Sequence, residues 1–139
     1  MFRNFVITVL FGVALAASVA LAKDAPFPIF AVRGTWEVKN DHGMKISVET
    51  GQRLENGEAV AVRVVVTNGD GQVLAKGEGV HRLNDVDLVV ELKDSEGHAV
   101  RLILSVDGED SSRITAGNFE LKMILEKLSG DRGVYILGR

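Results

Sequence analysis

Residues 86–107 read VDLVVELKDSEGHAVRLILSVD and carry the clearest pattern in the sequence. Apolar and charged residues alternate in its first half, so Leu88, Val90 and Leu92 share one face of an extended chain. A helix would scatter the same residues around its circumference, because its side chains repeat every 3.6 residues instead of every two. Turn-forming residues at 94–97 separate this run from a second alternating run. The stretch therefore predicts two antiparallel strands joined by a tight turn.

The same alternation recurs along the chain, with turn clusters rich in glycine, asparagine and aspartate between the runs. The predicted strands are residues 31–39, 44–51, 59–67, 72–82, 86–93, 98–107, 118–128 and 133–138. Eight strands joined by short turns predict an all-β, antiparallel up-and-down meander. Closure into a barrel removes its two free edges, so we expect an eight-stranded barrel. A two-sheet β-sandwich is the alternative.

The alternation also predicts which side chains point into the barrel. Apart from the indole N–H, the predicted inward set is wholly apolar. Its members are Trp36, Val38, Met44, Ile46, Val48, Val60, Val62, Val64, Val66, Leu88, Val90, Leu92, Val100, Leu102, Leu104, Val106, Phe119, Leu121, Met123, Leu125 and Ile136.

The first 22 residues have the composition of a secretory signal peptide. Arg3 supplies a positive charge, residues 5–22 contain no ionisable side chain, and the run ends in Ala20-Leu21-Ala22. A basic start, an apolar stretch and small residues at the junction are the three parts of such a leader. We therefore expect cleavage after Ala22 and a periplasmic or secreted protein. A retained single-span anchor is the alternative, because about 18 apolar residues can just cross a bilayer.

The composition bounds the rest of the protein. The chain has 139 residues, no cysteine and a formal net charge of −3, which suits one domain. Without thiols it forms neither disulfides nor cysteine-held metal sites, and its acidic balance argues against nucleic-acid binding. We expect an N-terminal extended segment at residues 23–30 and a barrel domain at 31–139. The charged outward face predicts that the mature domain does not insert into membranes.

The first predicted strand contains Gly34-Thr35-Trp36, with the only tryptophan of the chain, and Arg132 and Arg139 lie in the last strand region. A Gly-x-Trp on the first strand of an eight-stranded up-and-down barrel resembles the lipocalins and the wider calycin group. The resemblance implies that Trp36 plugs the closed end of the barrel. It also implies that Arg132 or Arg139 packs over the indole ring as a cation–π partner.

An eight-stranded barrel has an interior just wide enough to be filled by side chains or to hold one small ligand. Two hypotheses follow: a filled core, or a small dry pocket for an acyl chain, a terpenoid or an aromatic molecule. The second hypothesis gives a ligand-binding set with His81 at the rim of the pocket. Its residues are Trp36, Met44, Gly77, Gly79, His81, Phe119 and Met123.

The strand predicted at 72–82 carries little side-chain volume on its inward face, because Gly77 and Gly79 occupy two of its positions. Glycines inside a strand usually mark a bend, a bulge or a close approach by another group. The structural explanation is a corner of the barrel. The functional explanation is a ligand that lies against bare backbone, with His81 as its polar partner.

Several apolar residues interrupt the otherwise polar outward face. Val65, Val89, Ile103 and Ile124 are the candidates for an interface, because apolar residues on neighbouring strands can join into a patch. This favours a second hypothesis about function: a protein-interaction module, such as an envelope assembly factor or an inhibitor of an exported hydrolase. A homo-oligomer is another use of the same face.

Residue sets for catalysis or metal binding are missing from the sequence. The three histidines, His42, His81 and His98, have no partner at metal-ligand spacing. No nucleophile elbow, zinc-protease helix or phosphate-binding glycine loop occurs. We therefore expect no enzymatic activity, no metal and no cofactor. The protein is expected to bind either a small hydrophobic molecule or an envelope protein.

Overall fold

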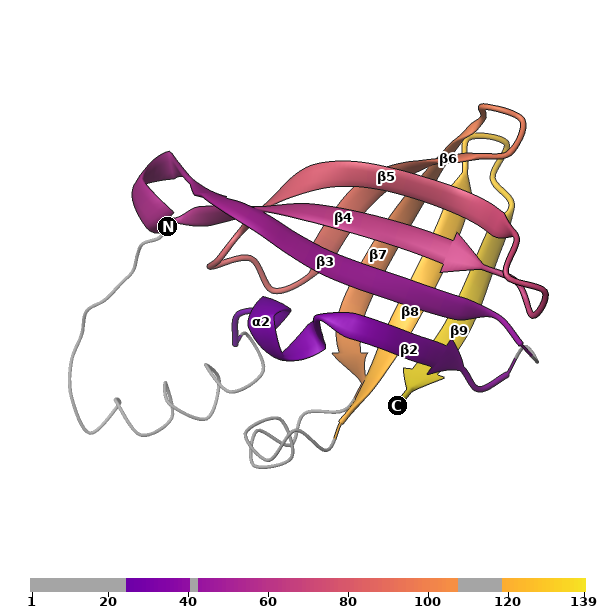
Figure 1. Ribbon diagram of the computed structural model, residues 1–139, viewed down its shortest axis with the longest axis horizontal. Helices are drawn as coiled ribbons and strands as arrows, with labels where there is room; N and C mark the ends of the chain where they lie inside the picture. The colour runs from indigo at the N-terminus through magenta and orange to yellow at the C-terminus, as the bar shows by residue number, and fades with distance from the viewer. Residues whose placement is uncertain (1–24, 41–42, 108–118) are drawn as a thin grey trace.

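The computed structural model describes residues 25–40, 43–107 and 119–139, and its strands form one closed antiparallel barrel (Figure 1). Neighbours along the chain are neighbours in the sheet. The strands are β2 (Gly34–Val38), β3 (Lys45–Leu54), β4 (Ala59–Thr67), β5 (Val73–Arg82), β6 (Leu88–Asp94), β7 (Ala99–Asp107), β8 (Glu120–Lys127) and β9 (Arg132–Gly138). The predicted up-and-down barrel is confirmed, each strand begins and ends within three residues of its predicted bounds, and the sandwich is excluded.

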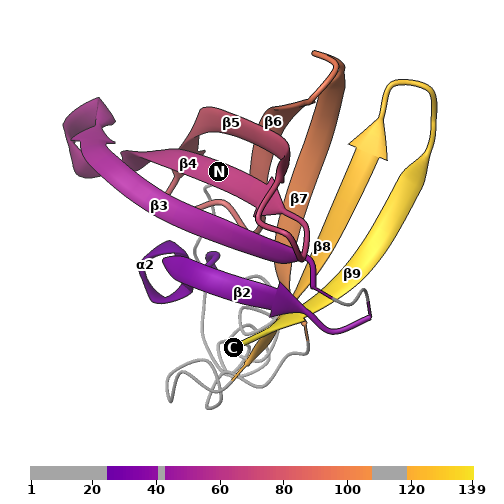
Figure 2. The same ribbon diagram turned by 45° about the vertical axis from the view of Figure 1, so that its right-hand side comes forward.

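The barrel closes where β2 pairs with β9, through Glu37 with Gly138 and Val38 with Leu137. Figure 2 shows β3–β5 lying across the view while β7–β9 lie steeply between its top and bottom, so the two groups cross at a steep angle around the core. The seam between these groups is β5–β6, whose paired residues are confined to the end near Asp94. Beyond that end the two strands have no paired residues, but β6 still packs against Gly77 and Gly79 of β5.

The core follows the predicted alternation closely. Seventeen of the predicted inward residues are buried, while Met44, Val106 and Leu125 are partly buried and pack against the core. Ile136 is a correction: it pairs with the outward Lys122, whereas Leu137 pairs with the buried Leu121. The last strand has four consecutive apolar residues at 134–137, so its alternation does not show which ones face inward.

The N-terminal segment that we expected to be extended contains a one-turn helix, α2 (Ile29–Val32). Phe27, Ile29 and Val32 are buried, because this turn folds against the end of the barrel and adds apolar surface to the core. In the part of the chain that the structure describes, no helix is long and apolar enough to cross a membrane. The leader predicted at 1–22 lies outside the described residues.

Candidate functional site

The end of the barrel next to α2 is closed by Trp36, whose side chain is 1% exposed. The indole Nε1 donates a hydrogen bond to the Val32 carbonyl at 2.7 Å. The guanidinium of Arg139 lies 4.3 Å from the centroid of the indole ring and donates to the Arg33 carbonyl. The expected basic partner of Trp36 is therefore Arg139. Gly34, which begins the motif, has a φ of +112°, a conformation that residues with a Cβ rarely adopt.

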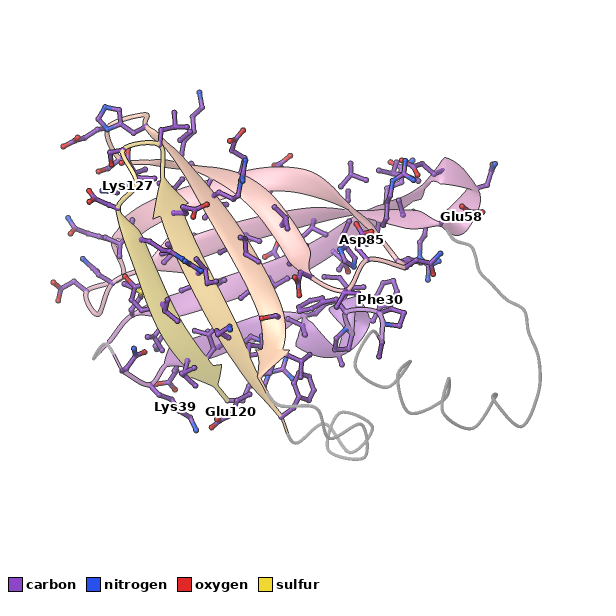
Figure 3. All side chains as sticks on the ribbon, turned by 180° about the vertical axis from the view of Figure 1, so that it is seen from behind. Phe30, Lys39, Glu58, Asp85, Glu120 and Lys127 are labelled. Carbon is purple, nitrogen blue, oxygen red and sulfur yellow. The ribbon has the colours of Figure 1, made fainter. Side chains whose placement is uncertain are left out.

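The opposite end of the barrel is an open pocket of about 520 Å³. In Figure 3, Lys127 marks this open end, and Phe30 and Asp85 mark the closed end. The pocket is bounded by the starts of β3, β5, β7 and β9 and by the ends of β4, β6 and β8. Its lining residues are Met44, Val66, Leu74, Ala75, Asp94, Ser95, Glu96, Val100, Leu125, Lys127, Asp131, Arg132, Gly133 and Tyr135.

The floor and walls of this pocket are apolar. Val66, Ala75 and Val100 are buried residues of the core, and Met44 and Leu125 are partly buried against it. Below the pocket the barrel is filled, since large side chains such as Leu102 and Leu104 are fully buried. The pocket is therefore a cup at one end of a packed barrel. A small molecule can occupy it even though side chains fill the centre of the barrel.

Tyr135 supplies the aromatic surface of the pocket. A Cβ placed on Gly133 would lie 2.6 Å from the Tyr135 hydroxyl, so the phenol ring lies over Gly133 on the inner wall. Tyr135 is the only tyrosine of the chain. A ring with an apolar face and a hydroxyl can contact an apolar molecule and also hydrogen-bond to a polar group on it.

The rim carries charges of both signs. Asp94, Glu96 and Asp131 are acidic, while Lys127 and Arg132 are basic. Asp94 accepts hydrogen bonds from the backbone N–H groups of residues 96 and 98, both at 2.9 Å. These hydrogen bonds, above all the one from residue 98, lower the pKa of the Asp94 carboxyl. Asp94 thus remains ionised and holds the β6–β7 turn in shape beside the pocket.

Of the seven predicted ligand-binding residues, only Met44 lines this pocket. Trp36 and Phe119 pack together at the closed end, with ring centroids 5.6 Å apart, and Met123 is fully buried in the core. His81 was expected at a rim, but it is 2% exposed and lies edge-on to Phe27 with ring centroids 5.8 Å apart.

His81 is the one buried polar side chain among the described residues. Its Nε2 has no hydrogen-bond partner. Burial lowers the pKa of the imidazole from its ordinary value of 6.5, and the nearby Asp85 carboxylate offsets part of this change. The neutral ring is therefore the form that the folded protein accommodates.

The two glycines of β5 face strand β6. A Cβ on Gly77 would lie 2.9 Å from the Cα of Leu92 and closer still to the Glu91 carbonyl oxygen. A Cβ on Gly79 would make an ordinary contact of 3.6 Å with Val90. The bare backbone at Gly77 is thus covered by β6, which corresponds to the structural explanation, a close approach at a corner of the barrel.

Three of the four predicted interface residues share one row. Val89 pairs with Ile103 and Ile103 pairs with Ile124, all on the outer face. The structure adds Val134, which pairs with Ile124. Val65 lies on β4 between Ser47 and Lys76, away from this row.

No protein-family model matches the chain, and no curated protein is significantly similar to it. Among the described residues, no group of three or more histidine, aspartate or glutamate side chains could hold a metal ion. The pocket at the open end is therefore judged on its own geometry and chemistry.

Proposed function

We propose that this chain is an exported, non-catalytic binding protein that holds a small, mainly apolar molecule in the open end of its barrel. The observation that supports this best is the pocket of about 520 Å³ with an apolar floor. Pockets that hold small molecules typically measure about 300–1,000 Å³ and combine apolar walls with a few polar groups. The plugged opposite end leaves a cup with one entrance, and the Trp36–Arg139 pair at the plug supports the resemblance to lipocalins.

The lining supports an amphiphilic ligand, such as a short acyl chain, a terpenoid or a substituted aromatic molecule. Its apolar part would lie on Val66, Ala75 and Val100, next to the Tyr135 ring. Its polar group would reach the mixed charges of the rim or the Tyr135 hydroxyl. Burying about 100 Å² of ligand apolar surface at the floor would contribute about 2.5 kcal/mol. A micromolar Kd corresponds to about 8 kcal/mol, so contacts with the Tyr135 ring and the rim would have to supply most of the binding free energy.

Two methionines make a direct test possible. Met44 lines the pocket, whereas Met123 is fully buried in the core. The protein is labelled with ¹³C at the methionine methyl groups and titrated with N-phenyl-1-naphthylamine, a neutral apolar fluorophore. We expect the Met44 methyl resonance to shift with saturation while the Met123 resonance keeps its position. Saturable binding that moves Met123 and leaves Met44 in place would contradict this site, as would the absence of any shift up to the solubility limit.

A matched pair of substitutions on β8 tests the same pocket by blocking it. Leu125 points into the pocket, and its neighbour Glu126 points outward. We expect Leu125→Trp to weaken binding of the fluorophore at least tenfold and Glu126→Trp to leave it unchanged. Equal effects of both substitutions would contradict the proposal. Export is tested separately, by mass spectrometry of the N-terminus of the protein that a cell produces from the full chain, where we expect Lys23 to be the first residue.

A further inference from the structure

The outer face of β6–β9 carries an apolar row that runs straight across four strands. Val89, Ile103, Ile124 and Val134 lie side by side in register. Val89 is 50% exposed and Val134 is 48% exposed. In Figure 3 this side of the barrel faces the viewer, with Lys127 and Glu120 at the two ends of β8. An isolated exposed valine needs no explanation, but a continuous row on neighbouring strands does.

The next row along the same strands consists of charges that alternate in sign. Glu91, Arg101, Glu126 and Arg132 lie side by side across β6, β7, β8 and β9. Cross-strand neighbours of opposite charge often pair within a sheet. In the described part of the chain, however, no ion pair within 4 Å joins any two of these four residues. The four charged groups are therefore available to a partner.

A third row adds a protruding leucine and a shallow hollow. The pairing of Val100 with Lys127 places Ala99 beside Leu128, one position further along. Leu128 is 92% exposed, the most exposed large apolar side chain among the described residues. Beside it is a depression of about 210 Å³, whose lining includes Ala99, Leu128 and three charges of the second row, Glu91, Arg101 and Glu126.

We propose that this face binds a second copy of the same chain, around a two-fold axis that runs parallel to the strands between β7 and β8. Such an axis reverses the order of each row when two copies meet face to face. The charge sequence −, +, −, + then meets its own reverse, so Arg101 faces Glu126 of the second copy and Glu91 faces Arg132. Every acid in the row meets a base.

The same axis makes the other two rows self-complementary. In the apolar row, Ile103 meets Ile124 of the second copy, and Val89 meets Val134. In the third row, Leu128 of each copy meets Ala99 of the other, so the exposed leucine enters the neighbouring hollow. One symmetry operation thus accounts for the apolar row, the alternating charges and the exposed leucine together. Binding to a different protein would not require each row to be complementary to its own reverse, whereas a two-fold dimer does.

The size of the patch predicts a weak dimer. Four strands spaced about 4.8 Å apart and three rows spaced about 6.7 Å apart, with side chains at the margins, span roughly 20 Å by 20 Å. Two copies would then bury about 800 Å² in total, less than the roughly 1,200 Å² of stable complexes and within the range of weak, transient ones. The dimer is therefore expected to form in the micromolar range and to dissociate on dilution.

The test is sedimentation velocity on the protein as the cell produces it, from about 1 µM to about 1 mM, the range that brackets such affinities. We expect a monomer–dimer equilibrium. Arg101→Glu places two acids opposite each other at both symmetric contacts, and Glu126→Arg places two bases there. Each variant alone is expected to dimerise at least about tenfold more weakly. Arg63→Glu, which reverses a charge on β4 away from this face, is the control and should dimerise like the wild type.

The decisive step is to mix the two single variants. Within one chain Arg101 and Glu126 are cross-strand neighbours. If the two residues interacted only within their own chain, mixing the two variants would not restore dimerisation. In a mixed dimer, both contacts between copies again join an acid and a base, so we expect the dimer to return. A wild-type protein that stays monomeric throughout, or a mixture that associates no better than its components, would overturn the proposal.

Discussion

The close approach of β5 to β6 at Gly77 leads to a prediction with an internal control two residues away. Gly77 and Gly79 lie on the same strand and the same face, and each is replaced by alanine. At Gly77 the new Cβ would lie 2.9 Å from the Cα of Leu92, with the Glu91 carbonyl nearer still. At Gly79 it would lie 3.6 Å from a methyl group of Val90, which is ordinary contact. The two substitutions therefore differ only in the space available.

The magnitude follows from these distances. Carbon atoms pack at about 3.5 Å or more, so β5 and β6 must separate by at least about 0.6 Å to accept alanine at Gly77. Forcing an extra group into packed structure costs about 1–3 kcal/mol, and both strands present backbone at this point, which cannot rotate away. We expect Gly77→Ala to lower the free energy of unfolding by about 2 kcal/mol. Gly79→Ala is expected to be neutral or to stabilise by up to about 1 kcal/mol, because it restricts the unfolded chain.

Urea unfolding followed by fluorescence measures both effects, since Trp36 is the only tryptophan and is buried in the folded barrel. At equal m-values, the urea midpoint gives the change in stability directly. A Gly77→Ala variant as stable as Gly79→Ala would refute the argument, because it would mean that β6 does not hold its position against β5.

Two further predictions concern side chains at the closed end. The folded protein lowers the pKa of His81 below 6.5, so the unfolded chain binds the proton more readily. The free energy of unfolding should therefore fall as the pH drops below 6.5, by up to about 1.4 kcal/mol per pH unit. His81→Phe should reduce this dependence on pH, and it should raise the free energy of unfolding at neutral pH by about 1 kcal/mol because it removes the unpaired Nε2. Urea unfolding at several pH values measures both effects, and an unchanged pH dependence would contradict the prediction. Arg139→Ala should lower the free energy of unfolding by about 1 kcal/mol by removing the cation–π contact with Trp36, and Arg139→Lys, which keeps the charge, should lower it by less. Equal losses for the two variants in urea unfolding would mean that the positive charge contributes nothing, and would contradict the cation–π contact.

The fold could be predicted from the sequence because the alternation and the turns act locally. In residues 86–107, the inward apolar residues of each strand recur at every second position, which specifies both an extended chain and its inward face. The prediction failed where that pattern is missing. In residues 134–137 every position is apolar, so the register of β9 depends on its pairing with β8 and Leu137, not Ile136, faces the core. The helix α2 was missed for a similar reason, since four residues carry too little periodicity to identify one turn.

The pocket was harder to predict because alternation gives the side of the sheet but not the depth along the barrel. Trp36, Met123 and Met44 all point inward, yet they lie at the plug, in the core and at the open end respectively. Depth depends on the tilt and stagger of the strands, which come from pairing across the whole barrel. Treating all inward residues as one lining therefore placed the ligand among residues that form the plug and the packed centre.

The topology of an up-and-down meander nevertheless determines at which end of the barrel each inward residue lies. Each strand reverses the direction of the one before, so the starts of β3, β5, β7 and β9 meet the ends of β4, β6 and β8 at one end. Applied to the predicted inward residues, this rule selects Met44, Val66, Val100 and Leu125, which do line the pocket. The Gly-x-Trp plug occupies the opposite end, because a plug and an entrance cannot share one end of a closed barrel. The same register that sets the depth of the inward residues also aligns the three outer rows, so the entrance and the proposed dimer face both follow from how the strands pair.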